Sequence, residues 1–184
     1  TYPGSGIAIG DVNGDGKADL VLGAPHASNN SNSESGSAYV IFSTLIDDVG
    51  ESTGNDKSLA TSTNYNIRYD GDTYSTNGNR LTLDDYQKFW HGSGRGSLIV
   101  IGDVNGDGKG DLILCAPNAY TGATKYTGAA WVIFSTLIDD VGENTGQNKP
   151  LYTSTNYNIR YATVSDYVSI TTNAAVAVGD VNGD

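Results

Sequence analysis

Short apolar stretches, each bounded by glycine, asparagine or aspartate, recur along the chain. The first four cover residues 6–10 (GIAIG), 18–24 (ADLVLGA), 37–43 (SAYVIFS) and 65–69 (YNIRY). Each has the length of a strand and is rich in β-branched or aromatic side chains, which favours β-structure over helix. The pattern therefore predicts four short strands joined by turns.

The same series returns later in the chain, so the sequence is built from repeats. The stretch IGDVNGDGKADLVLGAP, which ends at Pro25, recurs 92 residues further on as IGDVNGDGKGDLILCAP, which ends at Pro117. Residues 39–69 align without gaps to residues 131–161, and 25 of these 31 positions are identical. The second copy repeats the four apolar stretches at 97–102, 110–116, 129–135 and 157–161. A third copy of the polar motif, VGDVNGD, begins at Val178.

Four strands per repeat are typical of a β-propeller blade, a single antiparallel sheet that buries both faces only by packing on neighbouring blades. We therefore expect an all-β partial propeller with two complete blades and the start of a third. The units are a first blade with its connection at 1–92, a second blade at 93–170 and a truncated third at 171–184. Because closed propellers usually have four to eight blades, we expect the rest of a propeller or further copies of this chain as partners.

One helix interrupts the predicted β-pattern, in the connection between the two units. It covers Thr82–Trp90, where Thr82 is a candidate N-cap and Asp85 follows three residues later. This spacing is a weak match to a capping box.

Between the first two apolar stretches of each unit lies a loop rich in oxygen donors. In the first loop the donors at positions 1, 3, 5, 7 and 9 are Asp11, Asn13, Asp15, the carbonyl of Lys17 and Asp19, and Gly16 permits a bend at position 6. Such an irregular set of hard oxygen ligands suits calcium better than magnesium. A helical calcium hand is excluded because it needs a glutamate at position 12, where the two copies carry Leu22 and Leu114. The alternative to metal binding is an acidic turn held by side-chain to main-chain hydrogen bonds.

Charge and composition favour a cation as the partner of this chain. The formal net charge of −11 weighs against nucleic acid and anionic membrane surfaces, which bind clustered lysine and arginine. The sequence has no stretch of about 20 apolar residues, so we expect no membrane insertion. A single cysteine, Cys115, excludes an internal disulfide and a cysteine zinc site.

On these motifs the chain resembles the FG-GAP repeat family, the blades of the integrin α-subunit β-propeller and its microbial and protist relatives. GDVNGDGKADLVLGAP is similar to the calcium-binding and GAP half of that repeat, and GSAYVIF is similar to its third strand. The FG half is poorly kept, since GSG and HGSGRGS stand where a Phe-Gly pair is usual. Cys115 also replaces the GAP glycine that the first copy has at Gly23. These departures concern the connection between blades rather than the acidic loops.

The resemblance implies calcium as the cofactor, with two complete sites and an incomplete third. The first site is Asp11, Asn13, Asp15, the Lys17 carbonyl and Asp19; the second is Asp103, Asn105, Asp107, the Lys109 carbonyl and Asp111; the third begins with Asp180, Asn182 and Asp184. Clustered carboxylates repel one another unless a cation lies between them, so we expect the ion to have a structural role. An affinity on the order of 10⁻⁴ M, typical of extracellular modules, leaves such sites filled outside cells and empty in cytosol. We therefore expect an extracellular or cell-surface location.

Strand alternation places the acidic loops at the same end of each blade as residues 44–64 and their copy, which are almost constant between units. The connections at the opposite end differ in length and sequence. We infer that the calcium face is scaffold and that the opposite face binds a protein or glycan partner, as it does in family relatives. Aromatic side chains in these variable connections, Tyr74, Tyr86, Trp90, Tyr120 and Tyr126, are candidates for stacking on sugars or anchoring a partner. The alternative for each is ordinary packing at the rim.

The sequence presents no set of catalytic groups. The histidines are His26 and His91, in different loop contexts. Asp47-Asp48 recurs as Asp139-Asp140, but adjacent side chains point apart, which favours a solvated turn over a carboxylate pair. Cys115 lies in an apolar stretch, which predicts a buried, inert thiol. We therefore expect a non-enzymatic, calcium-stabilised module for adhesion or assembly; the alternatives are a lectin-like propeller and an accessory domain of a secreted enzyme.

Overall fold

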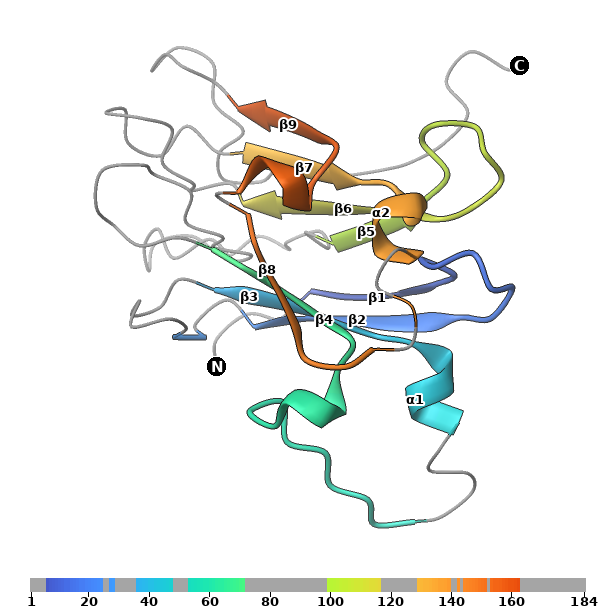
Figure 1. The fold of residues 1–184 in the computed structure, drawn as a ribbon, viewed down its shortest axis with the longest axis vertical. Helices are drawn as coiled ribbons and strands as arrows, with labels where there is room; N and C mark the ends of the chain where they lie inside the picture. The colour runs from blue at the N-terminus through green and yellow to red at the C-terminus, as the bar shows by residue number, and fades with distance from the viewer. Residues whose placement is uncertain are drawn as a thin grey trace, which may run out of the picture.

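The structure is a computed structural model that describes residues 6–24, 27–28, 36–47, 53–71, 99–116, 129–139, 142, 144–151 and 153–162. Within these residues the chain forms two β-sheets, one stacked on the other (Figure 1). The helix predicted at Thr82–Trp90 and the third copy of the acidic motif lie outside the described residues.

Four antiparallel strands of each sheet come from one repeat. The first contains β1 (Ile7–Gly10), β2 (Asp19–Ala24), β3 (Ser37–Ile41) and β4 (Ile67–Asp70), and the second contains β5 (Ile99–Gly102), β6 (Asp111–Ala116), β7 (Ala129–Ile133) and β9 (Ile159–Ala162). Neighbouring strands within each set of four are antiparallel and follow chain order. The prediction of all-β, four-stranded propeller blades is confirmed, and we call these sheets blade 1 and blade 2.

The third strand of each blade is shorter than predicted. We expected strands to continue to Ser43 and Ser135, but the identical sequence STLID forms a short helix in both units, α1 (Ser43–Asp47) and α2 (Ser135–Asp139). The prediction was wrong because the main-chain N–H of Ser43 donates to the carboxylate of Asp19 at 2.8 Å instead of pairing with a strand. In the described part of the chain no helix is long and apolar enough to cross a lipid bilayer.

Short 3-10 turns precede the last strand of each blade, η1 at Ser62–Asn64 and η2 at Ser154–Asn156. The sequence pattern also does not predict β8 (Gln147–Pro150), whose polar residues show no alternation. This strand belongs to the second unit but pairs in parallel with β4 of blade 1 (Figure 1). The two units are therefore joined by a strand that crosses between them as well as by stacking of their sheets.

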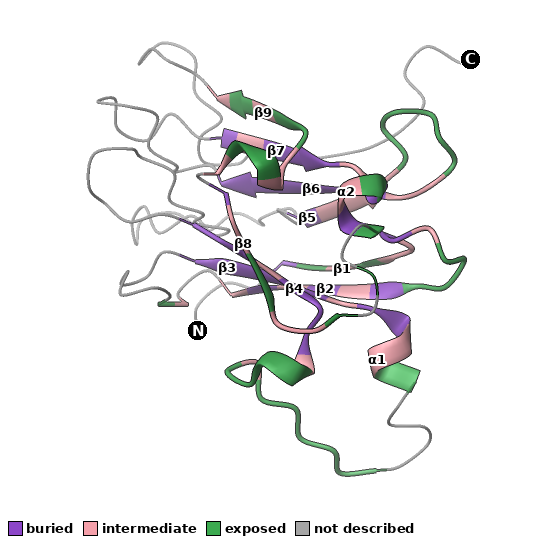
Figure 2. Cartoon of the chain, viewed as in Figure 1, coloured by how far each residue is buried: buried purple, intermediate pink, exposed green. Residues whose placement is uncertain are grey.

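The main core lies between the two blades. Blade 1 contributes Val21, Val40, Ile67 and Tyr69, and blade 2 contributes Ile99, Leu112, Leu114, Trp131 and Ile133. Figure 2 shows β3, β6 and β7 as largely buried. Since each sheet alone would leave one such face in water, burial of this apolar surface is the main force that holds the blades together.

A smaller core cluster, Ile113, Cys115 and Val132, lies on the other face of blade 2, because these residues alternate with those that face blade 1. Burial raises the pKa of the Cys115 thiol to about 12. A thiol that stays protonated at neutral pH is a poor nucleophile, in agreement with the predicted inert cysteine.

Candidate metal centre

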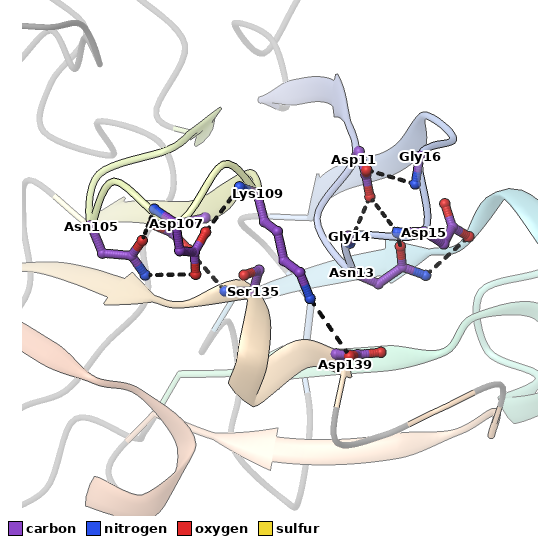
Figure 3. Close-up of polar contacts among 11 residues, drawn as sticks. Asp11, Asn13, Gly14, Asp15, Gly16, Asn105, Asp107, Lys109, Ser135 and Asp139 are labelled. Atoms are coloured by element: carbon purple, nitrogen blue, oxygen red, sulfur yellow. Dashed lines mark hydrogen bonds and ion pairs between the residues drawn. The ribbon is translucent and has the colours of Figure 1, made fainter.

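Asp11 organises the first acidic loop through its carboxylate. Its Oδ1 accepts hydrogen bonds from the N–H groups of Gly14 at 2.7 Å and Asp15 at 3.1 Å, and its Oδ2 accepts from Gly16 at 2.8 Å (Figure 3). Asn13 Nδ2 donates to Asp15 Oδ2 at 3.3 Å. Gly16 has a φ of 86°, which favours glycine and confirms the bend predicted at this position. The loop thus curls around the side chain of its first residue.

Asp19 ties this loop to the helix that follows β3. Its carboxylate is fully buried, with Oδ2 accepting from Val12 N at 2.9 Å and Oδ1 from Ser43 N at 2.8 Å. The Ser43 hydroxyl donates to Asp15 Oδ2 at 3.4 Å. Ser43 therefore connects Asp15 and Asp19, a role that sequence reasoning missed. The sequence does contain a signal for this role of Ser43, because IFSTLIDDVG is identical in both units.

The surroundings of Asp19 disfavour its charged form. Burial raises its pKa, the N–H groups of Ser43 and Val12 oppose this, and the charges of Asp15 and Asp11 raise the pKa further. A cation close to these carboxylates would offset both the loss of solvation and the mutual repulsion. The electrostatics of the loop therefore fit a bound cation.

The second loop repeats the first contact by contact. Asp103 accepts from the N–H groups of Gly106, Asp107 and Gly108 at 2.7, 3.1 and 2.7 Å. Its pKa is lowered, chiefly by the hydrogen bond from Gly108. Asp111 is fully buried like Asp19 and accepts from Val104 N at 3.0 Å and from Ser135 N at 2.9 Å. Figure 3 shows the two loops beside each other.

The hydroxyl of Ser135 marks a difference between the loops. It is buried and has no hydrogen-bond partner among the described residues, whereas the equivalent Ser43 reaches Asp15. Buried polar atoms are nearly always paired with protein groups, water or ions. A hydroxyl of this kind next to the Asp111 carboxylate fits an oxygen-coordinated ion, or its bound water, as the partner.

The carboxylates do not converge as a preformed cluster. Within the described ranges no three Asp, Glu, His or Cys side chains come together as a metal site would require. The loop carboxylates accept hydrogen bonds from main-chain N–H groups, and the predicted donors also include amide and main-chain carbonyl oxygens. The structure places Asp11, Asn13, Asp15, Lys17 and Asp19 in one loop and Asp103, Asn105, Asp107, Lys109 and Asp111 in the other. Calcium binding stays a prediction.

The two loops touch at Gly110 and Lys109. The Gly110 N–H donates to the carbonyl of Asp11 at 3.1 Å, and a Cβ atom at Gly110 would lie 2.5 Å from that oxygen. A Cβ atom at Gly14 would lie 2.5 Å from Lys109 Cδ, so the lysine chain passes along the first loop. The first loop carries the exposed Ala18 where the second has Gly110. This contact explains the one difference between GDGKADL and GDGKGDL.

Gly110→Ala is expected to lower the free energy of unfolding by about 1–3 kcal/mol, because the added methyl group overlaps the Asp11 carbonyl. Urea denaturation followed by tryptophan fluorescence measures this change. Ala18→Gly, the matched control at the exposed equivalent position, is expected to cost about 1 kcal/mol or less. Equal stability of Gly110→Ala and wild type would contradict the contact between the loops.

Lysines of both loops reach the helices behind them. Lys17 Nζ lies 3.1 Å from Asp47 Oδ2, and Lys109 Nζ lies 4.0 Å from Asp139 Oδ2 (Figure 3). Three of these side chains are exposed and that of Lys109 is partly exposed, so each pair contributes about 0–1 kcal/mol. Asp47 and Asp139 are solvated as predicted, although they end helices rather than lie in turns.

The remaining candidates lie outside the described residues. They are the third acidic motif, Asp180, Asn182 and Asp184; the loop aromatics Tyr74, Tyr86, Trp90, Tyr120 and Tyr126; both histidines, His26 and His91; and the second aspartates, Asp48 and Asp140. The glycan-stacking and third-site hypotheses therefore stay predictions.

Comparisons relate both loops to known proteins. A family model described as FG-GAP repeat matches residues 3–41 and 95–133, which hold the acidic loop and the first three strands of each blade. A phosphatidylinositol-glycan-specific phospholipase D of Rattus norvegicus is 30% identical over 129 residues, which cover 70% of this chain and 12% of that protein. The Bos taurus protein of the same name is 29% identical over 185 residues, covering 100% of this chain and 18% of that protein. The chain thus spans less than a fifth of these relatives.

Proposed function

Residues 3–41 and 95–133 are two FG-GAP repeats, and from this premise we propose that the chain is a calcium-stabilised, non-enzymatic segment of an extracellular β-propeller that serves adhesion or assembly. One observation carries the proposal. In both repeats a fully buried aspartate, Asp19 or Asp111, joins an acidic loop to the helix that follows the third strand. An ion bound by the loop would therefore stabilise the contact between loop and helix within the blade as well as the loop itself.

The donor set of each loop fits calcium. Asp11, Asn13, Asp15, the Lys17 carbonyl and Asp19 would hold one ion, and Asp103, Asn105, Asp107, the Lys109 carbonyl and Asp111 would hold the other. The ion supplies positive charge that offsets the repulsion of three carboxylates in a tight turn. The protein itself supplies the connection from loop to helix, through Ser43 in blade 1 and Ser135 in blade 2.

An extracellular location follows from the same donor set. A loop with three carboxylates and five protein donors is expected to bind calcium with a dissociation constant on the order of 10⁻⁴ M, which only an extracellular calcium concentration fills. The net charge of −11 is consistent with a protein that works with its cations bound.

Among the residues that the structure describes, a non-enzymatic role is supported by how the reactive groups are used. The Cys115 thiol is buried, and burial raises its pKa to about 12. The loop carboxylates are occupied by main-chain N–H groups rather than by a base or a nucleophile. Catalysis needs an acid–base or nucleophilic pair at hydrogen-bond distance, and these contacts provide scaffold instead.

A second candidate function is an accessory propeller of a larger secreted enzyme. It is favoured by the similarity to two phosphatidylinositol-glycan-specific phospholipases D, of which this chain matches only 12% and 18%. A catalytic domain in the same open reading frame would support it. A lectin-like function is the third candidate; binding to a glycan array that Trp90→Ala abolishes would favour it.

Calcium titration by isothermal calorimetry tests the proposal directly. We expect two ions per chain, with dissociation constants on the order of 10⁻⁴ M and no comparable heat from magnesium. Asp15→Asn and Asp107→Asn, at exposed loop positions, should each remove one ion and leave the other. Asp56→Asn is the matched control, since it removes one negative charge outside both loops.

Absence of calcium binding to the folded wild-type chain would refute the calcium proposal. Loss of both ions in Asp56→Asn would refute the assignment to the two loops.

A further inference from the structure

The two acidic loops are joined by a continuous chain of hydrogen bonds. The Gly110 N–H of the second loop donates to the main-chain carbonyl of Asp11 at 3.1 Å. That carbonyl shares a peptide unit with the Val12 N–H, which donates to Asp19 Oδ2 at 2.9 Å. In the second loop, the Gly110 N–H shares a peptide unit with the Lys109 carbonyl. Two peptide units therefore connect a proposed calcium ligand of the second loop, Lys109, with one of the first, Asp19.

The hydrogen bonds of this chain all run in the same direction, from the second loop toward the first. In such a chain each bond polarises the next, so the bonds strengthen one another. Polarisation of the Lys109 carbonyl by a cation would make the Gly110 N–H a stronger donor. The effect would pass through the Asp11 carbonyl to the Val12 N–H, which holds the Asp19 carboxylate in position. Ion binding in the second loop would therefore favour the arrangement that the first loop needs.

The side chain of Lys109 makes a second link between the loops. A Cβ atom at Gly14 would lie 2.5 Å from Lys109 Cδ and 2.7 Å from its Cε, so the lysine chain packs on the first loop (Figure 3). The Gly14 N–H in turn donates to Asp11 Oδ1 at 2.7 Å. The residue whose carbonyl is a proposed ligand in the second loop thus contacts the turn that orients the first ligand of the other loop.

Close packing at this contact leaves the loops little room to move independently. Val12 is fully buried in the core shared with blade 2, and Asn13 is 6% exposed. A Cβ atom at Gly110 would lie 2.5 Å from the Asp11 carbonyl oxygen and 2.9 Å from Ile101 Cγ2. Close-packed groups transmit a displacement to their neighbours instead of absorbing it. A change in one loop on ion binding is therefore passed to the other.

Charge acts against this coupling, but only weakly. An ion in one loop reduces the attraction of the other loop for a second cation. One divalent cation still leaves each set of three carboxylates with a net negative charge, so a filled loop does not become a cationic neighbour. At an ionic strength of about 0.15 M the Debye length is about 8 Å, so exposed charges on neighbouring loops are largely screened. The buried hydrogen bond between Val12 and Asp19 is screened much less.

We propose that the two loops bind calcium cooperatively, so that an ion in either loop raises the calcium affinity of the other about fivefold or more. This inference rests on the proposed calcium function and adds how the two sites regulate each other. The physical basis is shared ordering: the first ion orders both loops, so the second ion loses less conformational entropy on binding. Because linkage is reciprocal, the factor is the same in both directions.

Calcium titration of the full chain followed by ¹H–¹⁵N NMR, at an ionic strength of about 0.15 M, tests the coupling. The amides of Gly16 and Gly108 each donate to the first aspartate of their own loop, so each reports the occupancy of that loop. In Asp107→Asn the first loop should bind calcium about fivefold more weakly than in wild type. In Asp15→Asn the second loop should weaken by the same factor.

Gly110→Ala separates the contact between loops from the loss of a charge. Its methyl group overlaps the Asp11 carbonyl, while every proposed ligand remains. In this background Asp107→Asn should change the dissociation constant of the first loop less than about twofold, well below the coupling expected in wild type. Ala18→Gly, the matched control at the exposed equivalent position, should keep the full effect. If Gly110→Ala loses the second site, Lys109→Ala, which keeps the main-chain carbonyl, takes its place.

Three outcomes overturn the coupling: dissociation constants that do not depend on the state of the other loop, an ion in one loop that weakens binding in the other, or an unchanged effect of Asp107→Asn in the Gly110→Ala background. The same titrations keep this result apart from the proposed calcium function. Two ions bound independently refute the coupling and leave the calcium sites. Amides of Gly16 and Gly108 that do not move at about 10 mM calcium refute the calcium sites themselves.

Discussion

Removal of calcium is expected to lower the melting temperature of the chain by roughly 10–20 °C relative to 10 mM calcium. At about 100 times the dissociation constant, each site contributes about 2.7 kcal/mol, so two sites contribute about 5 kcal/mol. For a chain of 150–250 residues, each kcal/mol shifts the melting temperature by about 2–4 °C. The physical source is the burial of Asp19, which raises its pKa, together with the smaller effect of the negative charges of Asp15 and Asp11.

The measurement is a thermal melt by circular dichroism in chelator, with calcium or magnesium then added in excess. Calcium should restore the higher transition and magnesium should not, because magnesium demands a stricter octahedral geometry. Asp15→Asn combined with Asp107→Asn should abolish the calcium response while the chain still folds. A melting temperature that is the same in chelator and in calcium would contradict the structural role of the ion.

Leu151→Ala is expected to cost about 2–5 kcal/mol of folding free energy, the range for a leucine removed from a close-packed core. Leu151 comes from the second repeat and is fully buried beside blade 1, so this loss reports the crossing of β8. The matched control is Leu59→Ala at the equivalent, partly exposed position of the first repeat, which should cost under about 1 kcal/mol.

Both leucine variants are compared with wild type by urea denaturation. If the two substitutions lowered the free energy of unfolding equally, the pairing of β8 with blade 1 would not make Leu151 more important for stability than Leu59.

Local sequence was enough for most of the strands. The apolar stretches at 18–24 and 110–116 each follow an acidic loop, and each forms one strand, β2 and β6. The predicted ends of strands were less accurate where a side chain accepts a hydrogen bond from the main chain. Asp19 and Asp111 accept the N–H of Ser43 and Ser135, and this turns the ends of two predicted strands into helices.

The two acidic loops could be located from the sequence because their residues are close along the chain, whereas their role as calcium ligands stays a prediction. What supports them could not be predicted, since Ser43 lies 24 residues from Asp19, and Gly110 meets Asp11 only because the two blades stack. The difference between Ala18 and Gly110 cannot be explained within one repeat, because it depends on the contact between Gly110 and Asp11 of the other loop.

By itself, the sequence determined the all-β class, the two repeats and the position of the acidic loops, since period-two patterns and turn residues act over a few neighbours. Only the tertiary structure decided that QNKP becomes β8 while NDKS stays exposed, that Leu151 is buried and Leu59 is not, and that Tyr161 lies open where Tyr69 is covered. The physical reason is that nearly identical segments have different neighbours. A strand edge is satisfied or left open by what lies beside it in space, and no local pattern encodes that neighbour.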